Sequence, residues 1–345
     1  MTGQGALDPI MIVGNPGQEH VGSHLRRAAE ELNLTVHFVD TRGADGGWLP
    51  QKASWHLLKR RPARLRPFSR SVADLCAEHR PRIFLSTGFA PVTRLDLDRI
   101  GAFGIYRVNF LTDDPWNEAQ RAPWFLRAVC GYDEVLSTRR ANLNDLRALG
   151  CRRVGYLPFG YAPHLHFREQ LAPERMRALE SDVIFAGGGD RDRVPYIGAL
   201  AAAGLRVALY GGYWDHFAET RNLAQGLKSP AFVRQAVTAA KVALCLVRRA
   251  NRDGVCMRSF EVPAMGAAML VERTEEHAEL FGPEGQAVLY FGGIPEMIEK
   301  ARRLVNNEGE RVRLKEAAHR LIVTGNHTYR DRLASILECA SARAA

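Results

Sequence analysis

Short apolar runs alternate with stretches of helical spacing along most of the chain. In the first half, runs with the length of strands buried on both faces lie at 9–13, 35–39, 82–86, 106–111, 134–137 and 154–158. Between the first two runs, one face of a helix is predicted by Leu25, Ala28, Ala29 and Leu32. Strands that alternate with helices in this way predict βαβ units and a parallel sheet.

The alternation begins again after residues 159–173, a stretch rich in proline and aromatic residues that we interpret as a linker. Further strands are predicted at 182–186, 207–210, 242–247, 268–271 and 288–291. Helical stretches close the chain, with inward-facing stripes expected at Met297, Ala301 and Leu304 and at Leu314, Ala317 and Leu321. A chain of 345 residues with this pattern predicts an α/β protein of two successive domains and a helical tail.

Composition narrows the class of protein. The chain is 46% hydrophobic and 25% charged, which is typical of globular proteins, and it has no apolar run long enough for a transmembrane helix. The first residues lack the basic flank and apolar core of a secretory signal. Six cysteines are scattered without a Cys-x-x-Cys pair, so we expect reduced thiols in a cytoplasmic protein and no metal site.

The net charge of +9 suits a protein that binds anions, although a composition biased toward arginine gives the same value. Residues 52–70 combine basic and aromatic side chains. They fit either an anionic acceptor or membrane surface, or a solvated helix and loop whose apolar side chains pack inward. We favour the second interpretation and expect no specific nucleic-acid binding.

Polar residues follow two of the strands predicted in the first half. Gly14, Asn15, Gly17 and His20 follow the first strand, and their glycine spacing is not that of a dinucleotide-binding loop. They form either a tight turn or a loop at a cleft between domains.

Asp113 and Asp114 come directly after the strand at 106–111, at the sheet edge where ligands bind in open α/β sheets. Either carboxylate could contact a sugar hydroxyl or transfer a proton. Alternatively, the two residues form a turn and cap ahead of Pro115.

A glycine-rich loop follows the first strand of the second half. Gly187, Gly188 and Gly189 let the backbone approach a ligand closely. Arg191 and Arg193 then open a helix, where backbone N–H groups and guanidinium groups favour a diphosphate. An ordinary turn with solvated arginines would show the same residues.

The most informative stretch is 251–266. Arg258 and Glu261 are three residues apart on one helical face, and Asp253 lies eight residues before Glu261. A cation and an anion at a helix start suit a ligand with both phosphate oxygens and sugar hydroxyls. Glu261 is therefore a candidate to bind a ribose; the alternative is a surface residue paired with Arg258.

The segment Arg258-Ser-Phe-Glu-Val-Pro-Ala-Met-Gly266 resembles a motif of the CgeB-like glycosyltransferases. The resemblance extends over about 180–330 and is thinner over 1–165. Further matches are Thr112-Asp-Asp-Pro115, Arg193-Val-Pro-Tyr-Ile197, Leu209-Tyr-Gly-Gly-Tyr-Trp214, Glu279-Leu-Phe-Gly282 and His327-Thr-Tyr-Arg330.

This resemblance implies a GT-B fold, in which two Rossmann-like parallel-sheet domains face a cleft. Residues 1–165 would be the acceptor domain and 166–325 the donor domain. Residues 326–345 would form a C-terminal helix that packs back on the N-terminal domain.

The broader relatives are retaining glycosyltransferases of family four, which carry a glutamate-x7-glutamate motif. On that pattern Glu261 binds the ribose, while Asp253 and the backbone N–H groups of Gly254, Val255 and Cys256 contact the donor sugar. Tyr210 and Gly211 would line the same site. Two departures stand out: Asp253 is one methylene shorter than glutamate, and Tyr196 stands where the relatives' diphosphate clamp has a lysine. Arg258 would take over part of that clamp.

On this resemblance, the chain is expected to be a bacterial glycosyltransferase that moves a sugar from a nucleotide-diphosphate donor, expected to be of UDP type, to an unidentified glycan, protein or small molecule. Retention of configuration is expected, with no metal and no cofactor beyond the donor. The expected catalytic residues are Asp253, Arg258, Asp113 and Asp114. The alternatives are a non-catalytic module that binds a polyanion or nucleic acid on a degenerate GT-B fold, and a nucleotide-sugar epimerase.

Overall fold

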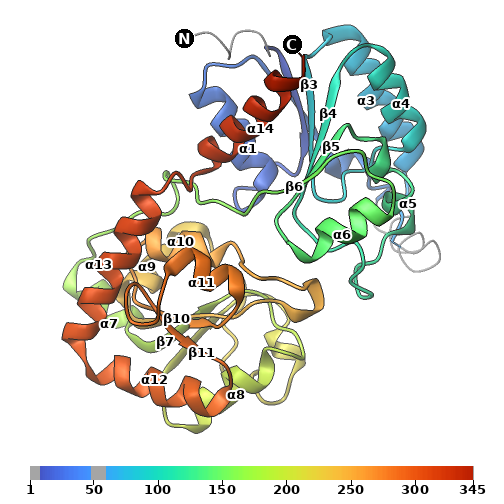
Figure 1. Ribbon diagram of the computed structural model, residues 1–345. Helices are drawn as coiled ribbons and strands as arrows, with labels where there is room; N and C mark the ends of the chain where they lie inside the picture. The colour runs from blue at the N-terminus through green and yellow to red at the C-terminus, as the bar shows by residue number, and fades with distance from the viewer. Residues whose placement is uncertain (1–7, 48–59, 345) are drawn as a thin grey trace. The chain divides into compact units, whose positions relative to one another are not determined.

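The computed structural model describes residues 8–47 and 60–344, and these form two compact units, each with its own parallel sheet (Figure 1). The first unit comprises the chain up to Phe159, the short segment Ala250–Arg252, and the chain from Tyr329 onward. The second unit comprises Gly160–Arg249 and Asp253–Thr328. The predicted α/β class with two parallel sheets is confirmed.

The sheet of the first unit has the order β2-β1-β3-β4-β5-β6, and every pair of neighbouring strands is parallel. Its strands are β1 (Ile10–Gly14), β2 (Val36–Asp40), β3 (Ile83–Thr87), β4 (Tyr106–Leu111), β5 (Glu134–Ser137) and β6 (Val154–Tyr156). All lie within two residues of the predicted runs. The inner strands are buried along nearly their whole length, because helices cover both faces of a parallel sheet.

Helices cover this sheet on both sides. In Figure 1, α1 and α14 lie together on one side, and α3 and α4 lie together on the other. α14 packs on α1, where the ring of Tyr329 stacks on His24 at 4.7 Å between centroids. The helices of this unit are α1 (Val21–Glu31), α3 (Leu65–His79), α4 (Arg94–Ala102), α5 (Pro123–Leu126), α6 (Ala141–Ala148) and α14 (Tyr329–Ala344).

Only part of the basic stretch at 52–70 is described. Within it, Leu65 and Phe68 are buried, whereas Arg66 and Arg70 are exposed. This part therefore matches the interpretation of a solvated helix with inward apolar side chains. Residues 52–59 of the stretch, including Lys52, lie outside the described residues.

The second sheet has the order β11-β10-β9-β7-β8 and is also parallel throughout. Its strands are β7 (Ser181–Ala186), β8 (Val207–Tyr210), β9 (Ala240–Cys245), β10 (Met269–Glu272) and β11 (Leu289–Phe291). From β7, the chain first extends the sheet on one side through β8 and then on the other through β9. The strand order therefore reverses between β7 and β9, which is the topological switch point of a doubly wound sheet.

Helices also surround the second sheet, and one predicted stripe is wrong. In α13 the buried positions are Leu314, Ala318 and Ile322, whereas Ala317 is half-buried and Leu321 is exposed. Both stripes have helical spacing, and the packing of α13 against α10 and α12 selects one of them. The helices are α7 (Pro173–Leu179), α8 (Val194–Ala202), α9 (Pro230–Ala239), α10 (Arg258–Ala264), α11 (Glu275–Phe281), α12 (Ile294–Asn306) and α13 (Glu308–Thr324).

Short 3-10 turns complete both units, at Thr41–Ala44, Val129–Gly131, Trp214–His216 and Arg249–Asn251. Across the described part of the chain, no helix combines the length and apolar character needed to cross a membrane.

Two glycines of the second unit should respond oppositely to substitution by alanine. Gly211 has φ +135°, and a Cβ there would lie 2.0 Å from the carbonyl oxygen of Gly187. Gly211→Ala should lower the free energy of unfolding by about 1–3 kcal/mol. Gly198 lies inside α8, and a Cβ there would have no atom closer than 3.7 Å, so Gly198→Ala should raise it by about 0.5–1 kcal/mol. Urea unfolding of both variants measures this; a Gly211→Ala protein as stable as wild type would contradict the close contact.

Candidate functional site

Two loops singled out by the sequence lie at the switch point of the second sheet. β7 ends at Ala186 and leads into the glycine-rich loop, while β9 ends at Cys245 and leads into the loop before α10. Because β7 and β9 are adjacent and parallel, their carboxyl ends meet at the same edge. Ligands bind in open α/β sheets at this place.

The glycine-rich loop is tied to the end of β8. The indole Nε1 of Trp214 donates to the carbonyl oxygen of Gly187 at 2.7 Å, and the amide of Gly189 donates to the carbonyl of Gly212 at 2.9 Å. Gly211, directly after β8, also packs closely against the carbonyl group of Gly187 in this loop. The structure thus brings the predicted residues 187–189 together with Tyr210 and Gly211, of which Tyr210 is buried.

The two arginines after this loop differ in their surroundings. Arg193 is buried, and its guanidinium donates to the carbonyl oxygens of Gly188 and Leu246, each at 3.1 Å. It therefore fastens the glycine-rich loop to the end of β9. Arg191 is exposed, and within the described residues its guanidinium is not engaged by backbone carbonyls. Of the two, Arg191 is the one whose charge faces solvent.

Arg258 and Glu261 form an ion pair in the first turns of α10. The Nε of Arg258 donates to the carbonyl oxygen of Ala186 at 2.8 Å, so the pair is fixed at the end of β7. The side chain of Glu261 is only 2% exposed. A surface position, the alternative that the sequence allowed, is therefore wrong for this carboxylate.

A buried histidine, His166, also lies next to Glu261. The Nδ1 of His166 accepts a hydrogen bond from the amide of Ala162 at 3.1 Å, so the proton of the neutral ring is on Nε2. That Nε2 lies 3.7 Å from the carboxylate of Glu261. Burial lowers the pKa of His166, although the charge of Glu261 opposes this shift. Glu261 is thus a buried, oriented carboxylate.

Asp253 closes a turn with Arg248. Its carboxylate accepts from the amide of Arg248 at 3.2 Å, and its own amide donates to the carbonyl of Arg248 at 3.3 Å. A Cβ on Gly254 would lie 1.9 Å from the carboxyl carbon of Glu276, so the flexible side chain of Glu276 would have to move to admit it. The turn before Gly254 is held by the two hydrogen bonds between Asp253 and Arg248.

A buried relay fixes the end of this loop. The amide of Cys256 donates to Ser259 Oγ at 3.1 Å, and Ser259 Oγ lies 2.8 Å from His277 Nε2. His277 Nδ1 lies 2.8 Å from the carbonyl oxygen of Glu272, which can only accept. His277 therefore carries its proton on Nδ1 and accepts from Ser259. Val255, between the two anchored ends, is buried.

In the first unit, the predicted loop after β1 is a compact turn. Asn15 Oδ1 accepts from the amide of Gly17 at 2.9 Å. A Cβ on Gly14 would lie 2.8 Å from the Cα of Gly22, so glycine permits α1 to pack closely on the strand end. His20 is exposed just before α1.

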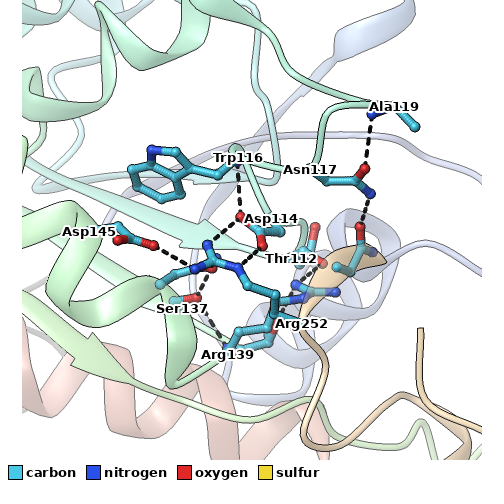
Figure 2. A network of polar contacts seen from close by, with 12 residues as sticks. Thr112, Asp114, Trp116, Asn117, Ala119, Ser137, Arg139, Asp145 and Arg252 are labelled. Atoms are coloured by element: carbon cyan, nitrogen blue, oxygen red, sulfur yellow. Dashed lines mark hydrogen bonds and ion pairs between the residues drawn. The ribbon is translucent and has the colours of Figure 1, made fainter. Parts of the chain in front are cut away.

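The two neighbouring aspartates after β4 have different environments, and Figure 2 shows that of Asp114. Asp114 is 1% exposed; its carboxylate accepts from the amide of Trp116 at 2.9 Å and from Arg252 at 2.6 and 2.9 Å. Asp113 is half-buried, and Thr112 Oγ1 donates to it at 3.2 Å. Asp114 thus forms the turn that its position before Pro115 allowed, together with a salt bridge, but the predicted cap is wrong because the next helix begins only at Pro123.

Sequence reasoning missed the partners of Asp114. Arg252 also pairs with Asp145 at 2.7 Å (Figure 2). Asn251 Oδ1 accepts from Asn117 Nδ2 at 2.5 Å. The hydrogen bond with Asp114 raises the pKa of Arg252 well above its usual value. The sequence offered one signal, the position of Asn251 and Arg252 directly before Asp253. No local pattern pairs residues that are 138 positions apart.

A match to a known protein family covers mainly residues of the second unit. Residues 193–338 match the family model described as glycosyl transferase-like. Within the described residues, no cluster of His, Cys, Asp or Glu has an arrangement that would hold a metal ion. A search of curated proteins finds no match to the sequence.

Solved structures resemble the whole chain. Sucrose-phosphate synthase from Thermosynechococcus elongatus superposes with a TM-score of 0.68 at 12% identity, covering 96% of this chain and 98% of that one. Anabaena HepE in complex with UDP-glucose gives 0.66 at 14% identity, covering 96% and 99%. A trehalose-6-phosphate protein from E. coli bound with UDP-2-fluoro glucose gives 0.65 at 12% identity, covering 96% and 98%.

The fold is GT-B. In this GT-B chain, the segment that carries Arg258 and Glu261 lies inside the matched region 193–338, and Asp113 and Asp114 lie outside it. The matched region therefore includes the end of β9 and the start of α10, which lie at the switch point of the second sheet.

The salt bridges of Arg252 allow a matched pair of variants. Asp114→Asn keeps the shape but removes a buried charge that two groups contact, so it should lower the free energy of unfolding by about 1–3 kcal/mol. Asp145 is 37% exposed, and Asp145→Asn should cost less than about 1 kcal/mol because solvent screens an exposed pair. Urea unfolding compares the two; equal losses would show that the burial of Asp114 has no energetic consequence.

The buried histidine predicts a pH dependence. Burial lowers the pKa of His277 to about 4 from 6.5, so the unfolded chain binds a proton more readily than the folded one between these values. Stability that is fully present above pH 6.5 should fall toward pH 4, by up to about 3 kcal/mol. Urea midpoints measured from pH 7.5 to 4.5 should fall more steeply for wild type than for His277→Gln. Parallel profiles would contradict the assignment.

Proposed function

We propose that this protein is a glycosyltransferase that moves a sugar from a nucleoside-diphosphate donor to an acceptor. The observation that carries the proposal is the buried carboxylate of Glu261, held by Arg258 at the end of β7 inside the segment that matches the glycosyl transferase-like family. A carboxylate that is oriented and shielded from solvent suits the two adjacent hydroxyls of a ribose.

The donor is proposed to be of UDP type. Support comes from similar structures whose ligands are UDP-glucose and UDP-2-fluoro glucose, although their low identity bears on the fold alone. We also propose that the protein belongs to the CgeB-like branch of these enzymes, and the motif around Arg258 and Glu261 supports this proposal.

Each element at the switch point has a proposed role. The guanidinium groups of Arg191 and Arg258 stabilise the negative charge that builds on the departing diphosphate, the interaction that usually dominates such sites. Asp253 and the amides of Gly254, Val255 and Cys256 orient the donor sugar. The fixed turn at Asp253 and the relay through Ser259 support this role, because they hold both ends of the loop.

Transfer is proposed to proceed with retention of configuration and without a metal ion. The leaving phosphate itself would assist deprotonation of the acceptor, so no dedicated base is assigned. Of the two aspartates after β4, we assign the acceptor contact to Asp113, because Arg252 and Trp116 already occupy the carboxylate of Asp114. The acceptor is a glycan, a protein or a small molecule.

A ligand panel tests the donor site. Wild-type protein should be stabilised by a nucleoside diphosphate or its sugar among UDP, ADP, GDP, dTDP and UDP-glucose, by roughly 2.7 kcal/mol at 100 times the dissociation constant. Glu261→Gln should weaken binding of the diphosphate and of its nucleoside alike, each about tenfold, because the ribose is common to both. Thermal shift and calorimetry measure these effects.

The control for Glu261→Gln is Glu316→Gln, whose carboxylate pairs with Arg168 at an exposed site of the same unit. It should bind nucleotides as wild type does. If Glu261→Gln binds every nucleotide with unchanged affinity, the ribose assignment is wrong. If wild type binds none of the five compounds, the proposed donor chemistry is wrong.

A further inference from the structure

We infer that Arg248, a residue outside the family motif, is a diphosphate-binding cation of the donor site. The inference rests on the proposed function and adds to it a residue that the sequence did not single out. Arg248 would supply the positive charge that is missing at Tyr196, the position where the family resemblance predicts a lysine that binds the diphosphate.

Arg248 lies at the switch point, three residues beyond the end of β9. Its terminal nitrogen Nη2 would be 3.4 Å from a Cβ placed on Gly188, so the guanidinium lies alongside the glycine-rich loop that follows β7. The backbone of this half-buried loop and the cation of Arg248 therefore lie next to each other, a combination that suits a diphosphate.

Asp190 orients the guanidinium of Arg248, which stays partly exposed to solvent. Its Nε lies 3.4 Å from Asp190 Oδ2, and its side chain is 31% exposed. Within the described residues, its guanidinium donates no hydrogen bond. The backbone of Arg248 is fixed on both sides by Asp253, so the side chain starts from a defined point.

Asp190 holds the arginine by its second oxygen. Its Oδ1 accepts from the amides of Asp192 and Arg193, at 3.1 and 3.0 Å, and so fixes the carboxylate at the start of α8. Its Oδ2 is buried without a hydrogen bond to the described residues and lies 3.7 Å from Arg193 Nε. Asp190 is thus a positioning residue for Arg248.

Apart from the exposed Arg191, three other arginines near this edge already make contacts with the protein. Arg193 donates to two backbone carbonyls, and Arg258 donates to Ala186 and pairs with Glu261. Arg249 contacts the hydroxyl of Tyr196 at 2.5 Å and the carboxylate of Glu272 at 2.6 Å. Tyr196 is therefore part of an anchor for Arg249, and the end of β9 supplies the cation that the tyrosine position lacks.

Calorimetry with UDP, ADP, GDP and dTDP, and ligand-observed NMR with the four matching nucleosides, tests the inference. Arg248→Ala should weaken the nucleoside diphosphate that wild type binds by about tenfold to a hundredfold and leave its nucleoside unchanged. Arg221→Ala, which removes an exposed arginine of the same unit, should change neither. The selective loss separates Arg248 from Glu261, whose variant should lose both ligands.

A double-mutant cycle tests the role of Asp190. Asp190→Asn keeps an oxygen for the amides of Asp192 and Arg193 but loses the charge, and it should weaken the diphosphate about threefold only while Arg248 is present. Unchanged diphosphate affinity in Arg248→Ala, or an equal loss of nucleoside and diphosphate, would overturn this inference and leave the proposed function standing. Failure of wild type to bind any of the four diphosphates would overturn both.

Discussion

The guanidinium of Arg258 joins the carboxyl end of β7 to the first turns of α10, and the candidate site depends on this contact. One nitrogen donates to the carbonyl of Ala186, and another holds the carboxylate of Glu261. Removing this cation would take away the ion-pair partner of a buried carboxylate, at a substantial cost in free energy. The pair therefore stabilises the local fold and, in the proposed function, holds Glu261 in position for a ribose.

The loops around this pair are held both by close backbone packing and by side-chain hydrogen bonds. Gly211 lets the end of β8 touch the loop after β7, and Gly254 leaves room for Glu276. Ser259 and His277 fix the amide of Cys256 through a relay of neutral groups. Such contacts orient the amides without adding charge, which leaves the electrostatics of the edge to the arginines.

These arginines divide into structural and available cations. Arg193 and Arg249 use their donors on carbonyl, hydroxyl or carboxylate oxygens of the protein. Arg252 does the same in the first unit, where it fills the carboxylate of Asp114. Arg191 is exposed, and Arg248 is oriented by Asp190 without a hydrogen bond from its guanidinium to the described residues. The chain has a net charge of +9, but the number of arginines that are not already paired within the protein is a better guide to anion binding than this net charge.

Local sequence pattern was enough to locate the strands, because the inner strands are buried on both faces and are therefore mostly apolar over a short run. It also marked the segment of Arg258 and Glu261, whose three-residue spacing is local. The orientation of α13, the engagement of Arg193 and Asp114, and the place of Arg248 depend instead on tertiary packing. In each case the deciding partner is distant in sequence: α10 for α13, Leu246 for Arg193, Arg252 for Asp114 and Gly188 for Arg248. Sequence spacing predicts which face of a helix a residue occupies. Long-range packing decides whether its charged group is paired within the protein or free to bind a ligand.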